Sequence, residues 1–317
     1  MLPSLAVCVL LLLILTPSVY AAPSACMTAE IDSTTAEAIW TLDSTTDDDT
    51  VNNHDKISGT GPQSYDTVDK VAGTASAVFN GTGGIRYSNH PSFMHDPFTE
   101  MSVMMWVKPD TLTPANPNGQ VLYEEGGSTN GVAVLLRNGD IGVWFASGGA
   151  RATLTAPMPS TDWHHIAVVY NAPYANLFID GESVDSVDTG FPTIPFHGHG
   201  GGLAEQVQSL PTATNASSFT GKLDEVYLVY DVIPGGDILQ YYQCLSGTSY
   251  ADAGCPEEGM LAQGNPDASW YEIDLLGSSF SGPTADDYPS RVNAIGYNEL
   301  DGLVYGYDAS ELLVIEA

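Results

Sequence analysis

The sequence predicts an all-β fold: an antiparallel jelly-roll β-sandwich over residues 36–232, with a short C-terminal β segment. Apolar or alternating segments recur about every 8–12 residues, which is the strand spacing of a sandwich or barrel. Stretches rich in Gly, Asn, Asp and Pro separate them and are typical of turns. Amphipathic helix periodicity is nearly absent, with one candidate of two turns from Gly236 to Cys244.

The strands and turns are clearest in the middle of the chain. Residues 101–107 are almost wholly apolar, which predicts a strand that is buried on both faces. Asn138-Gly139 predicts a tight hairpin, because both central residues of such a turn take positive φ, and Asp180-Gly181 predicts a second turn. The expected core comprises Trp40, Phe79, Val103, Met105, Val107, Val134, Leu136, Ile141, Val143, Trp163, Ile166, Val168, Leu177, Ile179, Leu223, Val226 and Leu228.

The N-terminal end has the pattern of a signal peptide. Residues 5–15 carry no charge, Pro17 breaks the apolar run, and residues 19–21 are apolar or small up to Ala21. We therefore expect cleavage after residue 21 and a secreted, extracellular protein. The apolar run is shorter than the roughly 20 residues that a membrane span needs, so the mature chain is expected to contain no span.

The charge is strongly acidic. The chain has 39 Asp and Glu against 8 Lys and Arg, a formal net charge of −31. Binding to nucleic acid or to anionic membranes depends on Lys and Arg, so neither is an expected partner. The balance favours a solvated acidic surface, divalent cations or a salty extracellular setting.

Four parts of the chain carry a resemblance. They are Trp40 to Asp43 with Gly73 to Gly81, Phe98 to Pro109, Trp163 to Tyr170 with Leu177 to Gly181, and Gly221 to Tyr230. In this order they resemble the laminin G-like and concanavalin A-like jelly-roll families. The resemblance implies a non-catalytic recognition or adhesion module that binds glycan or extracellular matrix protein through its rim loops, with Ca²⁺ as the one cofactor considered.

Two alternatives stay open. The first is an acidic structural protein of a cell wall or extracellular matrix. The second is a jelly-roll glycoside hydrolase, whose strand would carry three acids in the pattern Glu-x-Asp-x-x-Glu. Glu272 and Asp274 fit the first two positions, but Gly277 stands where the second Glu is required. The enzyme is therefore the less favoured alternative.

The C-terminal part is expected to differ from the sandwich. Residues 233–265 are interpreted as a linker with the short helix, and residues 266–317 as a partial propeller-like β segment. Trp270 to Asp274, Arg291 to Asn298 and Asp301 to Asp308 resemble the first repeat of a propeller-like domain. One repeat cannot bury its own face, so either the protein continues past Ala317 or these strands pack on the sandwich.

An acidic loop from Asp43 to Asp55 is the candidate metal site. It holds five Asp residues, and carboxylate oxygens suit Ca²⁺. In this fold the first and the closing strands are neighbours, so Asp43 and Asp224 are the expected ligands. The alternative is that Asp224 binds only backbone amides.

Other residues have expected roles in covalent chemistry. Asn80 and Asn215 begin glycosylation sequons. Cys244 is expected to form a disulfide with Cys255, a short loop away; Cys26 is the alternative partner, because the ends of a sandwich lie together.

Two short polar motifs complete the candidates. His197-Gly198-His199 in a Gly-rich loop, with Glu205, is a weaker metal hypothesis beside that of an exposed loop. Glu124-Glu125 is interpreted as an acidic turn after a strand.

Overall fold

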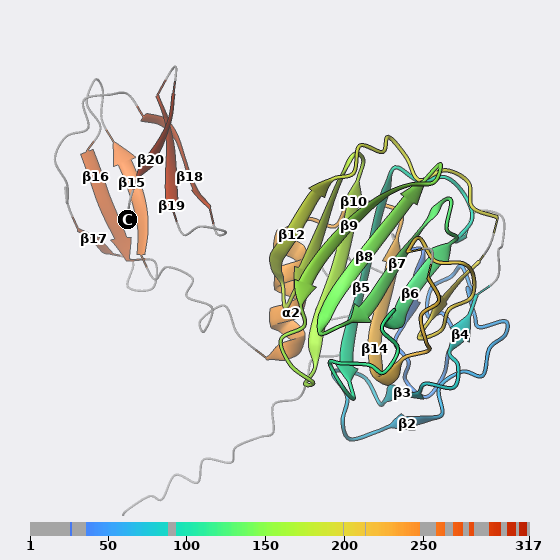
Figure 1. The fold of residues 1–317 in the computed structure, drawn as a ribbon. Helices are drawn as coiled ribbons and strands as arrows, with labels where there is room; N and C mark the ends of the chain where they lie inside the picture. Colours follow the sequence, from blue (N-terminus) through green and yellow to red (C-terminus); the bar gives the residue numbers. More distant parts are fainter. Residues whose placement is uncertain are drawn as a thin grey trace, which may run out of the picture.

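The computed structural model describes residue 26 and residues 36–87, 93–198, 200–212 and 214–247 in full, together with the backbone of six strands between residues 258 and 315. Two antiparallel sheets face each other (Figure 1). The predicted antiparallel jelly-roll sandwich is confirmed.

The larger sheet has eight strands in the order β12-β11-β10-β5-β14-β3-β2, and β1 also pairs with β14. Its strands are β1 (Ala38–Trp40), β2 (Ser64–Asp66), β3 (Ser76–Asn80), β5 (Glu100–Pro109), β10 (His164–Asn171), β11 (Tyr174–Ile179), β12 (Glu182–Asp188) and β14 (Thr220–Val229). A bulge in β14 between Asp224 and Tyr227 lies where β14 exchanges its neighbour. Residues 220–223 pair with β3, and residues 226–228 pair with β1.

The smaller sheet has six strands in the order β4-β13-β6-β7-β8-β9. They are β4 (Ile85–Arg86), β6 (Gln120–Gly126), β7 (Gly131–Arg137), β8 (Asp140–Ser147), β9 (Ala150–Pro157) and β13 (Gly201–Leu203). The hairpin expected at Asn138-Gly139 joins β7 to β8, with φ of 54° and 92° at the two residues. Asp180-Gly181 turns the chain from β11 to β12 in the same way, with φ of 53° and 85°.

The main core lies between the two sheets and contains every predicted core residue except Trp163. Alternation along β5 explains the division, because Val103, Met105 and Val107 point inward while Met104 and Trp106 point to the outer face. Trp163 is half-buried on that outer face, where its indole Nε1 donates to Asp69 at 2.9 Å. The prediction that Trp163 belongs to the core between the two sheets is therefore wrong.

A helix covers part of the outer face of the larger sheet. Helix α2 (Gly235–Ser246) begins after Pro234 and ends at Gly247, whose φ of 71° suits a left-handed C-terminal cap. Its buried residues Ile238, Tyr241 and Leu245 pack with Met104 and other outward-facing residues of the sheet. The segment that the sequence placed in a linker thus contributes a helix to the sandwich (Figure 1).

The disulfide joins Cys244 to Cys26 across 218 positions, with their Cα atoms 5.6 Å apart. The preferred pairing with Cys255 is wrong, and the alternative partner is the one observed. Because α2 packs on the sheet, Cys244 is brought back to the start of the domain. Cys255 lies outside the described residues.

The C-terminal strands form two three-stranded antiparallel sheets, β15-β16-β17 and β18-β19-β20. They are β15 (Glu258–Gln263), β16 (Ser269–Asp274), β17 (Ser279–Ser281), β18 (Val292–Asn298), β19 (Leu303–Asp308) and β20 (Glu311–Ile315). The propeller-like interpretation of this segment stays a prediction.

Candidate functional site at one end of the sandwich

A buried carboxylate, that of Glu125, lies at the end of β6. Glu125 follows Tyr123 by two positions, so both side chains project to the same side of the strand, into the sandwich. Its Oε2 accepts a hydrogen bond from the Tyr123 hydroxyl at 2.6 Å. Its Oε1 accepts from the Tyr230 hydroxyl at 3.0 Å and lies 2.8 Å from Nε2 of His197. These contacts satisfy the carboxylate, which is fully buried.

The neighbouring residue Glu124 projects the opposite way and is also buried. It accepts hydrogen bonds from the backbone N–H groups of Val207 and Gln208 at 2.5 and 3.0 Å. Burial raises the pKa of Glu124 to about 8 despite these bonds. The interpretation of Glu124-Glu125 as an acidic turn is therefore wrong: both residues lie in a strand, and one fixes the loop at 207–208.

His197 connects Glu125 to the surface. Its Nδ1 lies 2.9 Å from the carbonyl oxygen of Pro195, while Nε2 faces Glu125. Burial opposes a charge on this ring, but the hydrogen bond and the negative charge of Glu125 outweigh it and raise the pKa of His197.

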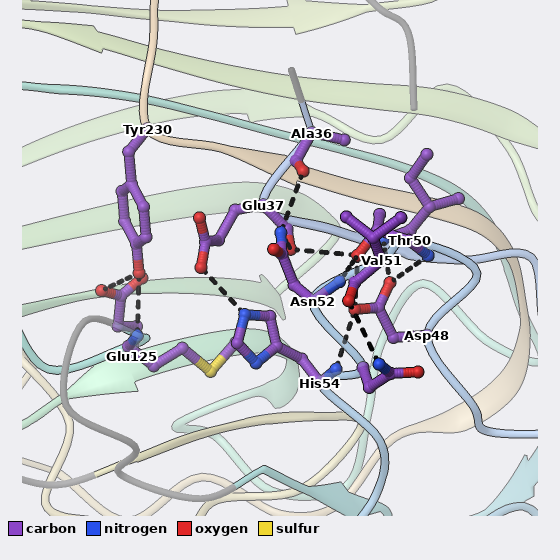
Figure 2. Close-up of polar contacts among 12 residues, drawn as sticks. Ala36, Glu37, Asp48, Thr50, Val51, Asn52, His54, Glu125 and Tyr230 are labelled. Atoms are coloured by element: carbon purple, nitrogen blue, oxygen red, sulfur yellow. Dashed lines mark hydrogen bonds and ion pairs between the residues drawn. The ribbon is translucent and has the colours of Figure 1, made fainter. Parts of the chain in front are cut away.

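The network extends toward the first strand (Figure 2). The Tyr230 hydroxyl accepts from the backbone N–H of Met94 at 2.9 Å while it donates to Glu125. In the same view Glu37 Oε1 lies 2.8 Å from Nε2 of His54. Side chains from the beginning, the middle and the end of the domain therefore meet at one end of the sandwich.

A polar hollow of about 270 Å³ opens beside His197. The turn Gly127–Asn130 forms one wall, Phe196–Gly198 another, and Gln208–Ser209 a third. Phe196 is 52 % exposed, and its ring makes an edge-to-face contact with the ring of His95, with centroids 4.2 Å apart. The Asn130 side-chain amide donates to the Phe196 carbonyl at 2.9 Å. We call this the Phe196 hollow.

A second hollow of about 340 Å³ lies beyond Tyr230. Phe98, Tyr230 and Thr193 line it together with residues 96–97 and 99–100. Tyr230 lines this hollow, and His197 lines the Phe196 hollow. The buried Glu125 carboxylate contacts both side chains and so links the two hollows. Asp96 and Glu100 make the second hollow acidic.

A family profile described as the concanavalin A-like lectin/glucanases superfamily matches residues 79–238, about half of the chain. The chain belongs to this superfamily.

Two solved structures illustrate the likeness of the fold. Domain 4 of AbnA, a GH43 extracellular arabinanase from Geobacillus stearothermophilus solved with arabinotriose, has 20 % identity and a TM-score of 0.50, covering 66 % of this chain and 98 % of that one. The botulinum neurotoxin serotype D ligand binding domain, solved with N-acetylneuraminic acid, has 10 % identity and a TM-score of 0.53, covering 92 % and 74 %. No curated protein sequence matches the chain.

The two Asp residues expected to bind calcium do converge in this superfamily fold. Asp224 Oδ2 accepts from the backbone N–H groups of Val71 and Ala72 at 2.7 and 3.3 Å. Asp43 Oδ1 accepts from the N–H groups of Thr74 and Ala75. Both carboxylates thus bind the backbone of the same loop, residues 71–75. For Asp224, bonding to backbone amides is what the alternative interpretation expected.

The rest of the acidic loop is also used internally. Asp48 Oδ1 accepts from the N–H of Ile39 at 2.9 Å, and its Oδ2 accepts from the N–H of His54 at 2.8 Å. Figure 2 shows Asp48 among Thr50 and His54. Among the described residues, no group of three or more His, Cys, Asp or Glu side chains is placed to hold a metal ion. Calcium binding stays a hypothesis that these contacts do not favour.

The described residues of the weaker metal hypothesis, His197 and Glu205, also have other partners. Glu205 bonds the guanidinium of Arg86 and accepts from the backbone N–H of Gly84 at 3.0 Å. Both nitrogens of His197 face oxygens, as described above, and His199 lies outside the described residues. The structure therefore does not bring His197 and Glu205 together as ligands.

The two sequons lie on the surface. Asn80 ends β3, and its Oδ1 accepts from the Thr82 hydroxyl at 2.7 Å, while Asn215 lies in the loop before β14. Both residues are exposed. Glycosylation at these positions stays a prediction.

One polar chain was missed by the sequence analysis. Asp180 Oδ2 lies 2.6 Å from His164 Nδ1, and His164 Nε2 lies 2.9 Å from Ser160 Oγ. This is the order of groups in a serine hydrolase triad. Ser160 Oγ is also the acceptor for the N–H of Asp162 at 3.0 Å, which closes a turn, and neither of the two hollows contains these residues. We interpret this series of hydrogen bonds as a structural link between the turn at residues 160–162 and the hairpin at Asp180.

Proposed function

We propose that this chain is a binding module for uncharged saccharides and that the Phe196 hollow is where the saccharide binds. The observation that carries the proposal is a half-exposed aromatic ring beside a polar concavity. The proposal includes an extracellular setting. The Cys26–Cys244 disulfide supports that setting, since such bonds persist in oxidising compartments, and the N-terminal segment has the pattern of a signal peptide.

The hollow has the two surfaces that a sugar needs. One face of a pyranose ring carries C–H groups, which pack on the electron-rich face of an aromatic ring such as Phe196. The hydroxyl groups need hydrogen-bonding partners, and residues 127–130 and 208–209 provide backbone groups together with Ser, Thr, Asn and Gln side chains. A polar concavity with one aromatic platform matches an uncharged ligand that presents both hydroxyl groups and an apolar ring face.

The charge around the hollow favours an uncharged ligand. None of the described residues that line it is Lys or Arg, and the charge of His197 is paired with Glu125. Arg151 lies nearby, but its Nε donates to the carbonyl of Pro211 at 2.5 Å and its guanidinium faces the carbonyl of Ser128 at 3.5 Å. With a chain charge of −31, a carboxylated or sulfated glycan would meet net repulsion.

The comparisons are consistent with a binding role but support only the fold. Both similar structures named above contain a bound saccharide, one neutral and one acidic. The residues in this chain that resemble a hydrolase strand, Glu272 and Asp274, lie in β16, which belongs to neither sheet of the sandwich. We therefore propose binding without catalysis.

The test uses matched pairs of glycans. The full chain is titrated with neutral oligosaccharides and with their sialylated counterparts, and we expect affinity only for the neutral members. Phe196→Ala should weaken binding about fivefold or more, which corresponds to about 1 kcal/mol for a lost ring contact. Tyr174→Ala is the matched control, since Tyr174 is 58 % exposed and lines neither hollow.

Two binding results would overturn the proposal. One is equal affinity for wild type and Phe196→Ala, which would place the saccharide elsewhere. The other is preference for the sialylated member of each pair, which would show that Arg151 or another cationic side chain binds the carboxylate of sialic acid. Trimming of the oligosaccharides during the titration would contradict the absence of catalysis.

A further inference from the structure

We infer that the charged pair of Glu125 and His197 holds the Phe196 hollow in its binding form, so that the hollow loses this form when His197 loses its proton. The inference rests on the proposed function, because it describes how the same site is regulated. It also makes a claim about Phe196 that is measurable without any ligand.

The geometry requires a proton on both ring nitrogens of His197. Nδ1 faces the carbonyl oxygen of Pro195 at 2.9 Å, and a carbonyl oxygen only accepts. Nε2 faces Oε1 of Glu125 at 2.8 Å, an oxygen that already accepts from the Tyr230 hydroxyl. A neutral imidazole would turn one unprotonated nitrogen toward an acceptor. The two contacts therefore fit an imidazolium that donates to Pro195 and to Glu125.

The ring of His197 fixes the segment that carries Phe196. Through Nδ1 it fastens the carbonyl of Pro195, the residue before Phe196. The backbone N–H of His197 donates to the carbonyl of His95 at 3.0 Å, and His95 is the residue whose ring packs on Phe196. Loss of the Nδ1 proton removes the hydrogen bond to the carbonyl of Pro195, and loss of the Nε2 proton removes the hydrogen bond to Glu125 that holds the ring in place. The position of the ring at the edge of the hollow thus depends on the charge.

The direction of the pH effect follows from the raised pKa. Glu125 and, more weakly, Asp96 favour the charged form of His197, against the cost of its burial. A group whose pKa is raised on folding contributes stability that is complete below its unfolded value of about 6.5, and that is lost as pH rises through the folded pKa. The hollow is therefore formed below about pH 6.5 and loosens as the pH rises through the raised pKa of His197.

Other titratable groups near the pair need controls. Tyr123 and Tyr230 donate to the same carboxylate, and burial raises the pKa of each well above the ordinary tyrosine value. The negative charge of Glu37, the residue before β1, also raises the pKa of Tyr230. His95, whose Nδ1 lies 3.5 Å from Asp96, is the main rival, because its ring touches Phe196.

The experiment follows three signals of the full chain against pH: the imidazole ¹⁵N resonances, the ring resonances of Phe196, and neutral oligosaccharide binding. We expect all three to change at one midpoint. Glu125→Gln removes the negative charge but keeps an accepting oxygen, and it should lower that midpoint by about one pH unit or more. His95→Gln should leave the midpoint in place.

The outcomes separate the two proposals. If His197 and Phe196 titrate together but no oligosaccharide binds at any pH, the charged pair holds the hollow and the proposed function is wrong. If Phe196 resonances do not follow the titration of His197, or follow that of His95, the inference is overturned even where saccharide binds. Because Glu125→Gln has a buried amide and could unfold, the wild-type titration alone decides between these results.

Discussion

Oε1 of Glu125 and Nε2 of His197, from residues 72 positions apart in the sequence, lie 2.8 Å from each other, and both side chains are buried. The first residue ends a strand of the smaller sheet, and the second lies in the segment that leads to β13. Through Tyr230 the same carboxylate is fastened to the end of β14 in the larger sheet. This arrangement joins the two sheets at the end of the sandwich where the hollows open.

The hydroxyl of Tyr230 should matter more for stability than that of Tyr170. Tyr230 donates to a charged carboxylate and accepts from Met94, whereas Tyr170 donates to the neutral carbonyl of Phe191 at 2.9 Å. We expect Tyr230→Phe to lower the free energy of unfolding by about 1.5–3 kcal/mol, and Tyr170→Phe by about 0.5–1.5 kcal/mol. Urea denaturation measures both. A larger loss in Tyr170→Phe would contradict the importance given to the Glu125 network.

The acids of the β14 bulge should make the protein less stable as pH rises. Burial raises the pKa of Asp224 to about 8, against the hydrogen bonds from Val71 and Ala72. Burial and the charge of Asp224 raise the pKa of Glu225 to about 9. Between about pH 4 and 9 these two acids bind more protons in the folded chain than in the unfolded chain, so their contribution to the free energy of unfolding falls with increasing pH.

The test of this bulge is a pair of isosteric substitutions. Asp224→Asn combined with Glu225→Gln should flatten the pH profile of unfolding and raise stability at pH 9 relative to wild type. Glu182→Gln, which removes an exposed acid of β12, should change stability by no more than about 0.5 kcal/mol at any pH. A wild-type profile that rises from neutral to alkaline pH would show that the two acids are ionised in the folded state.

The Cys26–Cys244 bond should contribute strongly to stability. It closes a loop of 218 positions, and in the chain-entropy model such a link is worth about 5 kcal/mol. We expect Cys26→Ser to lower the free energy of unfolding by several kcal/mol, and Cys255→Ser, which leaves the bond intact, to lower it little. Peptide mapping that recovers Cys244 linked to Cys255 would refute this pairing.

Calcium should not alter the melting temperature. Asp224 Oδ2 and Asp43 Oδ1 accept from backbone N–H groups of residues 71–75, so one oxygen of each carboxylate already has partners in the folded chain. An ion bound only by the folded state would raise the melting temperature in millimolar Ca²⁺ relative to a chelator. A rise in wild type that Asp224→Asn abolishes would restore the calcium site and contradict this expectation.

The strands and turns could be predicted because their signals are local. Asn138-Gly139 and Asp180-Gly181 determine the backbone of their own turns, and the apolar run at residues 101–107 indicates burial without reference to distant residues. Trp163 shows the limit of this reasoning. Its apolar character indicates burial, but the choice between the two faces of the larger sheet depends on α2 and on Asp69, which the pattern around Trp163 does not reveal.

Most of the site could not be predicted, because its residues are defined by distant partners. Two consecutive Glu residues usually indicate an exposed turn, and nothing near Glu125 in the sequence points to His197 or Tyr230. Phe196 lies in a segment without strand or helix periodicity, so its half-exposed ring becomes meaningful only beside residues 127–130. By contrast, the approach of Asp43 to Asp224 was predicted from the pairing of the first and closing strands.

The central claim is that a neutral saccharide binds beside Phe196, and mapping backbone amide resonances during a titration with a neutral oligosaccharide tests it most directly. The account predicts that the largest shifts fall on residues 127–130, on Phe196 and on Gln208–Ser209, the walls of the Phe196 hollow. Shifts confined to another surface, or no shifts at oligosaccharide concentrations far above those of ordinary lectin binding, would contradict it.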